Sequence, residues 1–217
     1  MDNAVALVQA YLRVNGYFTV AEFPVVEAAG AHRTLTDVDI LAFRFPHAGH
    51  RRGAPGRTVD SEVFAPDPVL GRPGEVSDML VGEVKEGRAH LNPAARDPDV
   101  LAAALQRFGC CAPEEAPQVV ADLRSSGVAA TAAGHQIRLV AFGSSLDEEQ
   151  DGPRFFTFIP MRHVVGFLQD HLRRHWEIVR HVQTKEPVLG FLLTMEKALR
   201  GAGNHAGAAA ATVEAAR

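Results

Sequence analysis

Three side chains that could act together on a phosphate ester lie in two strand-like segments. Glu83 and Lys85 end the apolar run 79–85, and Asp39 lies within 35–45, where apolar and polar residues alternate. Residues two apart on a strand point to the same face, so Glu83 and Lys85 project together, and Asp39 on a neighbouring strand can project beside them. Two carboxylates and an amine that converge at the end of a sheet are suited to phosphodiester cleavage.

The chemistry of this trio predicts a metal-dependent reaction. Carboxylate oxygens are the ligands that Mg²⁺ and Mn²⁺ prefer, so Asp39 and Glu83 are expected to hold such an ion. The backbone carbonyl of Val84 could supply a further oxygen ligand. The ion would neutralise a phosphate oxygen and acidify a water, and Lys85 could position that water or counter the charge of the transition state.

Hydrophobic periodicity predicts the elements that position these residues. The expected strands are 17–26, 35–45, 79–85, 136–142 and 155–159. The expected helices are 4–12, 97–108, 113–124, 161–182 and 187–199. This order predicts an α/β fold with an αβββαβ core, a mixed central sheet flanked by helices, and a C-terminal helical extension.

The composition predicts one domain over residues 1–200. The segment 46–75 is rich in Pro and Gly and is expected to be a long loop, with a short strand pairing around 59–64. A loop of this length in a compact domain is usually functional or disordered. The Ala/Gly-rich segment 201–217 is expected to be a frayed or disordered tail.

Two motifs and the order of the elements resemble the PD-(D/E)XK nuclease superfamily, which has the restriction-endonuclease-like fold. The motifs are D-V-D-I-L-A at 37–42 and G-E-V-K at 82–85, and the N-G-Y-F sequence at 15–18 after the first helix is also similar. The resemblance implies that Asp39 and Glu83 are metal ligands and that Lys85 is the catalytic lysine. It favours Asp39 over Asp37, because family members usually place the acid directly before the apolar run.

The chain departs from this family in two ways. Many members carry a glutamate on the first helix, whereas the expected helix 4–12 has none, so Glu22 or Asp2 would have to substitute. The separation between Asp39 and Glu83 is also long for the family, because the 46–75 insertion lies between them.

Charge is distributed unevenly along the chain. The net charge is −4, yet residues 154–200 carry eight basic and four acidic residues, a net charge of +4 that leaves −8 elsewhere. This excludes a protein that coats nucleic acid through bulk charge, and it leaves room for local phosphate contacts. The predicted substrate contacts are Arg51, Arg52, Arg173, Arg174 and Arg180. For the last three, a solvated helix face paired with Asp170 and Glu177 is the alternative interpretation.

The sequence supports neither a membrane protein nor a disulfide-stabilised secreted protein. No apolar run approaches the ~18 residues of a membrane helix, and Cys110 and Cys111 are adjacent, which favours a reduced, cytoplasmic setting without a disulfide framework. We therefore expect a nuclease acting on DNA, with RNA left open and the C-terminal helices available for a homodimer. The alternatives are a non-catalytic member of the same fold that binds nucleic acid or protein, and an unrelated α/β regulatory module.

Overall fold

The computed structural model describes residues 2–26, 34–48, 66–71, 75–146, 155–182 and 184–214. Within these ranges only the backbone is described for 26, 34, 35, 94 and 202–214. The chain divides into two compact units, Met1–Val165 and Gly166–Arg217. The sequence predicted one domain over 1–200. None of the described helices is long and apolar enough to cross a membrane.

The first unit is built on a mixed six-stranded sheet, which confirms the predicted α/β class. The sheet order is β1-β2-β3-β6-β5, and β8 also pairs with β6. The strands are β1 (Phe18–Val26), β2 (Thr34–Arg44), β3 (Asp78–Val84), β5 (Val128–Ala130), β6 (Gln136–Gly143) and β8 (Thr157–Pro160). Pairs β1·β2, β2·β3 and β5·β6 are antiparallel, whereas β3·β6 and β6·β8 are parallel.

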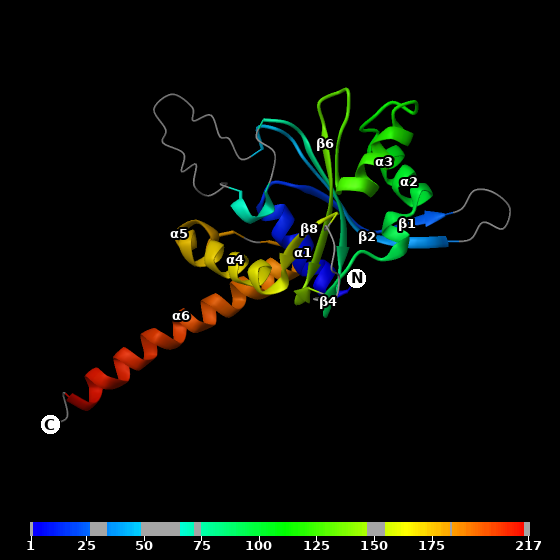
Figure 1. Cartoon of the computed structure of the whole chain (residues 1–217). Coiled ribbons are helices and arrows are strands. Elements are labelled where there is room, and N and C mark those ends of the chain that lie inside the picture. Colours follow the sequence, from blue (N-terminus) through cyan, green and yellow to red (C-terminus); the bar gives the residue numbers. More distant parts are fainter. Residues whose placement is uncertain are drawn as a thin grey trace, which may run out of the picture. The chain divides into compact units, whose positions relative to one another are not determined.

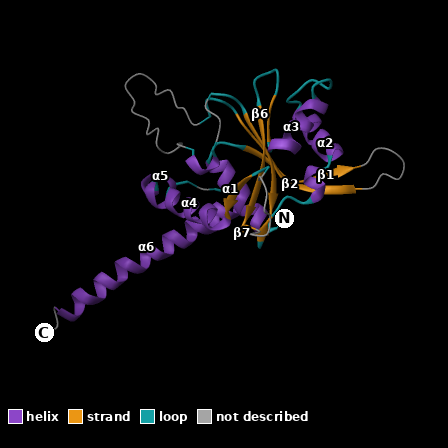
Figure 2. Ribbon diagram, in the orientation of Figure 1, coloured by secondary structure: helices purple, strands orange, loops and turns teal. Residues whose placement is uncertain are grey.

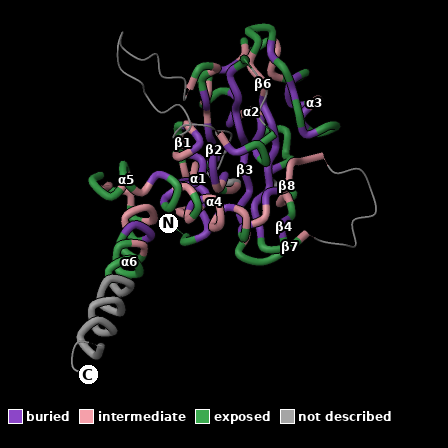
Figure 3. Tube along the Cα trace, turned by 90° about the vertical axis from the view of Figure 1, so that its left-hand side faces the viewer, coloured by how far each residue is buried: buried purple, intermediate pink, exposed green. Residues whose placement is uncertain are grey.

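Helices cover both faces of this sheet (Figures 1 and 2). Helix α1 (Asn3–Val14) lies on one face, where Tyr11 contacts Phe142 of β6 edge to face. Helices α2 (Pro98–Phe108) and α3 (Ala116–Ser126) lie on the other face, on a core of buried side chains. Strands β3 and β6 are buried along almost their whole length (Figure 3). The predicted order αβββαβ is present, the helix predicted at 113–124 is α3, and the short strand β5, which was not predicted, lies between α3 and β6.

Local sequence explains where the helices begin and end. The Asp2 carboxylate accepts a hydrogen bond from the amide of Ala4 and caps α1. Helix α2 begins in the same way at Asp97, followed by Pro98 at its first position, and ends at Gly109 in the left-handed conformation. These capped boundaries agree with the predicted ones to within a few residues.

The predicted helix 161–182 is wrong as a single helix. The chain forms α4 (Met161–Arg174) and α5 (Trp176–Val179), because His175 between them adopts the non-helical angles φ −103° and ψ 23°. The final helix α6 (Pro187–Glu214) continues beyond the predicted end at 199. Its Ala-rich sequence has high helix propensity, which explains why the backbone stays helical where a frayed tail was expected.

The part of the 46–75 segment around residue 67 is held in place by side chains of α1 and α4. Residues 68–70 form a short 3-10 helix, η2 (Pro68–Leu70), preceded by the buried carboxylate of Asp67. Asp67 accepts hydrogen bonds from Tyr11 Oη at 2.7 Å and contacts His163 Nε2 at 2.5 Å. The strand pairing predicted around 59–64 lies outside the described residues.

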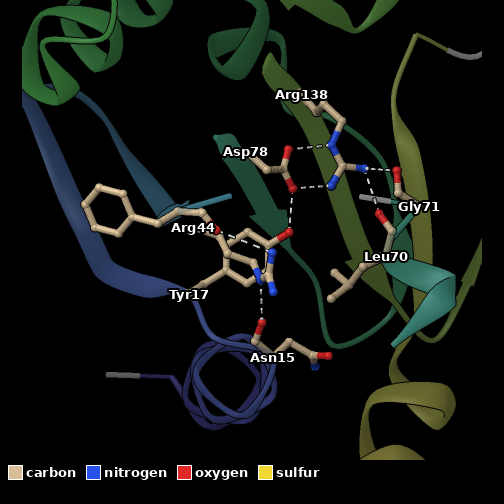
Figure 4. A network of polar contacts seen from close by, with 8 residues as sticks. Asn15, Tyr17, Arg44, Leu70, Gly71, Asp78 and Arg138 are labelled. Atoms are coloured by element: carbon tan, nitrogen blue, oxygen red, sulfur yellow. Dashed lines mark hydrogen bonds and ion pairs between the residues drawn. The ribbon is translucent and has the colours of Figure 1, made fainter. Parts of the chain in front are cut away.

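A buried ion pair joins β3 to β6 at the start of β3 (Figure 4). Arg138 donates two hydrogen bonds to Asp78, Nε to Oδ1 at 2.9 Å and Nη2 to Oδ2 at 2.6 Å, and a third to the carbonyl of Leu70 at 2.7 Å. Tyr17 Oη also donates to Asp78, and burial, together with the negative charge of Asp78, raises the pKa of Tyr17 above its usual value. Arg138 and Asp78 thus join two strands and the end of η2 at one point.

Replacing Asp78 with Asn would remove the charge that compensates buried Arg138 while keeping the shape of the side chain. We expect Asp78→Asn to lower the free energy of unfolding by about 3–5 kcal/mol, the usual cost of leaving one partner of a buried pair uncompensated. Chemical denaturation followed by circular dichroism measures the change. The matched control is Asp37→Asn at an exposed position of β2, expected to change stability by no more than about 0.5 kcal/mol. Equal losses in the two variants would contradict the compensating role of Asp78.

Candidate active site

The side chains of Asp39, Glu83 and Lys85 converge at the end of β3. Lys85 Nζ lies 2.5 Å from Glu83 Oε1 and 3.9 Å from Asp39 Oδ2. Both carboxylates therefore lie on the same side of the sheet, around one ammonium group. The sequence-based prediction required this juxtaposition, and carboxylates on opposite faces would have excluded a shared cation.

Strand register explains why the two acids meet. Ile40 pairs with Gly82 in the antiparallel β2·β3 ladder, so the next residues along, Asp39 and Glu83, lie opposite each other. Lys85 follows two residues after Glu83 and projects to the same face. The close pairing of Gly82 with Ile40 also leaves no room for a side chain, because a Cβ at Gly82 would lie 2.5 Å from Ile40 Cγ2.

The backbone hydrogen-bond ladder between β2 and β3 ends at this point, and the Asp39 side chain accepts the next hydrogen bond from β3. The Val84 amide donates to Asp39 Oδ2 at 2.7 Å, whereas the Lys85 amide donates to the Phe142 carbonyl on β6 at 2.9 Å. In a trans peptide the carbonyl of Val84 points away from the Lys85 amide, and hence toward the β2 side. The Val84 carbonyl, predicted as a ligand, therefore points toward the strand that carries Asp39.

Glu83 is the most deeply buried acid of this group. Its side chain is 5% exposed, compared with 24% for Asp39 and 31% for Lys85. Burial raises the pKa of Glu83 above its usual value, and the nearby Asp39 charge adds to this, while the hydrogen bond from Lys85 opposes it. For Lys85, burial lowers the pKa, but the hydrogen bond and charge of Glu83 and the charge of Asp39 outweigh burial and raise it. Lys85 is therefore a protonated donor at neutral pH.

Two further acids surround this trio. Glu22 lies between Ala21 and Phe23, which pair with Ile40 and Val38, so Glu22 is opposite Asp39 in the register. Its φ of 52° is unusual for a residue other than glycine, and its Oε1 accepts the amide of Asp2 at 3.2 Å. Asp2, the other substitute considered for the helix glutamate, also raises the pKa of Lys85 through its charge.

The oxygen donors of this site suit Mg²⁺ or Mn²⁺ better than zinc or copper. Asp39 and Glu83 supply carboxylates, and Mg²⁺ commonly takes one or two of these and completes its shell with water. In the described part of the chain, no group of three or more His, Cys, Asp or Glu is placed to hold a metal. An ion here would depend on these two carboxylates, with the Val84 carbonyl as a backbone donor.

Two of the five arginines predicted to contact the substrate, Arg51 and Arg52, lie outside the described residues. In the second unit, Arg173 contacts Glu196 at 3.4 Å and Asp170 at 3.8 Å, and Arg180 contacts Glu177 at 3.1 Å. Arg174 is exposed. The pairing of Arg173 and Arg180 matches the solvated-face alternative.

The sequence-based interpretation missed His90 as a neighbour of the site. The charge of His90, which follows the short strand β4 (Arg88–Ala89), lowers the pKa of Glu83. β4 pairs with another two-residue strand, β7 (Ser145–Leu146), and no periodic pattern can identify strands of this length.

Comparisons with protein-family models, curated proteins and solved structures gave no match for this chain.

Lys85→Met removes the only amine of the trio and should make stability depend more steeply on pH. Without Lys85, burial and Asp39 would raise the pKa of Glu83 further, so the folded state would hold its proton more tightly than the unfolded state does. Stability relative to wild type should therefore fall as pH rises from about 4.5 to 8. We expect a loss of about 1–2 kcal/mol at pH 8, less than for a fully buried pair because Lys85 is partly exposed, and a smaller loss at pH 5.

Denaturation of wild type, Lys85→Met and Lys85→Arg at the two pH values measures this effect. Lys85→Arg keeps the positive charge and should retain most of the pH profile of the wild type. A loss in Lys85→Met that is the same at pH 5 and pH 8 would show that Lys85 stabilises through packing and not through Glu83.

Proposed function

We propose that this protein is a metal-dependent phosphodiesterase that acts on nucleic acid, with Asp39, Glu83 and Lys85 as its catalytic group. The observation that carries the proposal is the convergence of two carboxylates on one protonated lysine at the end of a sheet. This combination and its spacing are also what the resemblance to the PD-(D/E)XK superfamily implies.

Each residue has a distinct role in this proposal. Asp39 and Glu83 would hold Mg²⁺ or Mn²⁺, together with the Val84 carbonyl. When bound, the ion would supply charge neutralisation at the phosphate and acidification of water. Lys85, whose pKa is raised by Glu83 and Asp39, would stay protonated and donate hydrogen bonds to the phosphate as negative charge builds in the transition state. Its protonation at neutral pH argues against a role as general base.

The architecture around the trio would keep these roles in place. The Val84 amide holds Asp39 Oδ2 at 2.7 Å, so this carboxylate has a fixed orientation before any substrate arrives. Glu83 is held by Lys85 and by its position in a strand paired on both sides. Such preorganisation lowers the cost of arranging charges during reaction.

A second candidate function is a binding module with the same fold and without catalysis. It is favoured by the 2.5 Å contact between Lys85 and Glu83, because this ion pair compensates part of the charge of the buried carboxylate without a metal. A direct assay separates the two candidates.

Cleavage assays with Mg²⁺ or Mn²⁺ on single-stranded, duplex and branched DNA test the catalytic proposal. Glu83→Gln, Asp39→Asn and Lys85→Met should each lower the rate by at least about 100-fold, the typical effect of removing one group that stabilises transition-state charge. Asp37→Asn is the matched control, since Asp37 is an exposed acid on the same strand, and it should retain wild-type activity. No cleavage by the wild type, or equal cleavage by all variants, would favour the binding module.

Metal binding can be measured without activity. We expect Mg²⁺ or Mn²⁺ to stabilise the wild type against unfolding by about 1.4 kcal/mol at ten times its dissociation constant. Asp39→Asn and Glu83→Gln should lose most of this gain, whereas Asp37→Asn should keep it. Thermal denaturation at constant ionic strength measures the shift. The same metal-induced shift in all four proteins would contradict a metal site at Asp39 and Glu83.

A further inference from the structure

An exposed cluster of aromatic side chains lies at one end of the β1·β2 hairpin. Phe18 pairs in register with Phe43, and Phe45 follows directly after β2. The Phe45 ring contacts both others at nearly right angles, with centroids 6.2 Å from Phe18 and 4.6 Å from Phe43. Phe18 is 69% exposed and Phe45 is 55% exposed. We call Phe18, Phe43 and Phe45 the aromatic platform.

The edge-to-face contacts hold these rings together, although two of the three face solvent. Phe43 also packs against the core beneath α2 and α3, which anchors the platform on one side. Exposed apolar side chains that cluster in this way usually mark an interaction surface, because single scattered ones would not support each other.

The platform lies on the same face of the sheet as the candidate active site. Asp39, Leu41 and Phe43 alternate along β2 and therefore share a face. At about 3.3 Å per residue, Asp39 and Phe43 are about 13 Å apart along the strand, a span of roughly four nucleotides at ~3.4 Å each. Leu41, between Asp39 and Phe43 on β2, is buried in the core under α2 and α3. The exposed surface between the platform and the acids therefore runs along the edge strand β1, past Val20, the exposed partner of Leu41.

The edge strand β1 is poorly suited to pairing with a further protein strand. Pro24 has no amide hydrogen to donate, and Glu22, with φ 52°, interrupts the extended backbone. Both features are typical of edges that resist strand addition. A ligand that contacts the exposed rings, and not the backbone edge, fits this surface better.

On the platform's face of the sheet, an exposed arginine lies beside β1. Arg107, in the last turn of α2, lies over the Phe23 ring at 5.9 Å. A guanidinium group on this face can bind a phosphate of a strand whose bases stack on the platform rings.

We propose that the aromatic platform binds unpaired bases of a single-stranded nucleic acid and leads that strand to Asp39, Glu83 and Lys85. This rests on the proposed function, because it names the substrate class of the same site. Aromatic stacking tolerates any base, since every base has a π-face, so the strand would be held without sequence readout. Duplex DNA keeps its bases stacked inside and cannot use the platform in this way.

Binding of a fluorescent 12-nucleotide single strand to the full chain, measured by anisotropy with EDTA to prevent cleavage, tests the proposal. Phe18→Leu and Phe45→Leu keep an apolar side chain but remove the ring, and each should weaken binding roughly 5- to 100-fold. Phe18→Trp should bind as tightly as the wild type or more so. The control Val128→Ala changes an exposed apolar residue on β5 and should have no effect.

A substrate without bases separates this proposal from the proposed function. Bis(4-nitrophenyl) phosphate is too short to reach the platform from the acids, so Phe18→Leu should cleave it at the wild-type rate. If neither the wild type nor Phe18→Leu cleaves this ester, the catalytic proposal fails. Binding of the single strand that depends on the rings would still support the role of the platform in binding.

Three outcomes would contradict the proposal that the platform binds a single strand. The first is binding by Phe18→Leu that equals the wild type, and the second is binding by Phe18→Trp as weak as that of Phe18→Leu. The third is a wild-type dimer in sedimentation that Phe18→Leu converts to monomer, because the platform would then be the contact between two copies of the chain.

Discussion

The site depends on how the backbone amides of Val84 and Lys85 satisfy their hydrogen bonds. The Lys85 amide pairs with Phe142 on β6, and the Val84 amide has lost its backbone partner on β2, where the ladder has ended. A buried amide without a partner is costly, and the Asp39 carboxylate accepts it at 2.7 Å. One acid therefore completes the sheet and faces the lysine at the same time, so the position of Asp39 follows from backbone chemistry.

The buried carboxylates at the two ends of β3 are compensated to different extents. At its start, Asp78 accepts two hydrogen bonds from Arg138 and one from Tyr17, so the buried charge is fully compensated and holds the strands together. At its end, Glu83 has one lysine as its partner, and burial still raises its pKa. A buried acid with incomplete compensation reduces stability, and it is a place where an added cation would be favourable.

Sequence patterns predicted the sheet, most helices and the three converging side chains, because each depends on short-range periodicity. Alternation along 79–85 placed Glu83 and Lys85 on one face, and the resemblance to the PD-(D/E)XK superfamily favoured Asp39 over Asp37. The Asp78–Arg138 pair could not be predicted, since it depends on the register of β3 against β6, two strands separated by about fifty residues of chain. The break at His175 was missed for a similar reason, because the apolar stripe continues through it. The aromatic platform was missed because a strand pattern does not tell which phenylalanines stay exposed.

The uneven charge of the chain bears on how a nucleic acid could be held. Arg173 and Arg180 in the second unit already contact Glu196, Asp170 and Glu177, so binding phosphate there would mean replacing existing ion pairs. The first unit places its acids at the candidate site, where phosphate is repelled until a cation is present. Stacking on exposed rings provides attraction that needs no excess of positive charge and that salt does not screen. For a chain with net charge −4, aromatic contacts near the site are therefore a physically sound way to bind a polyanion.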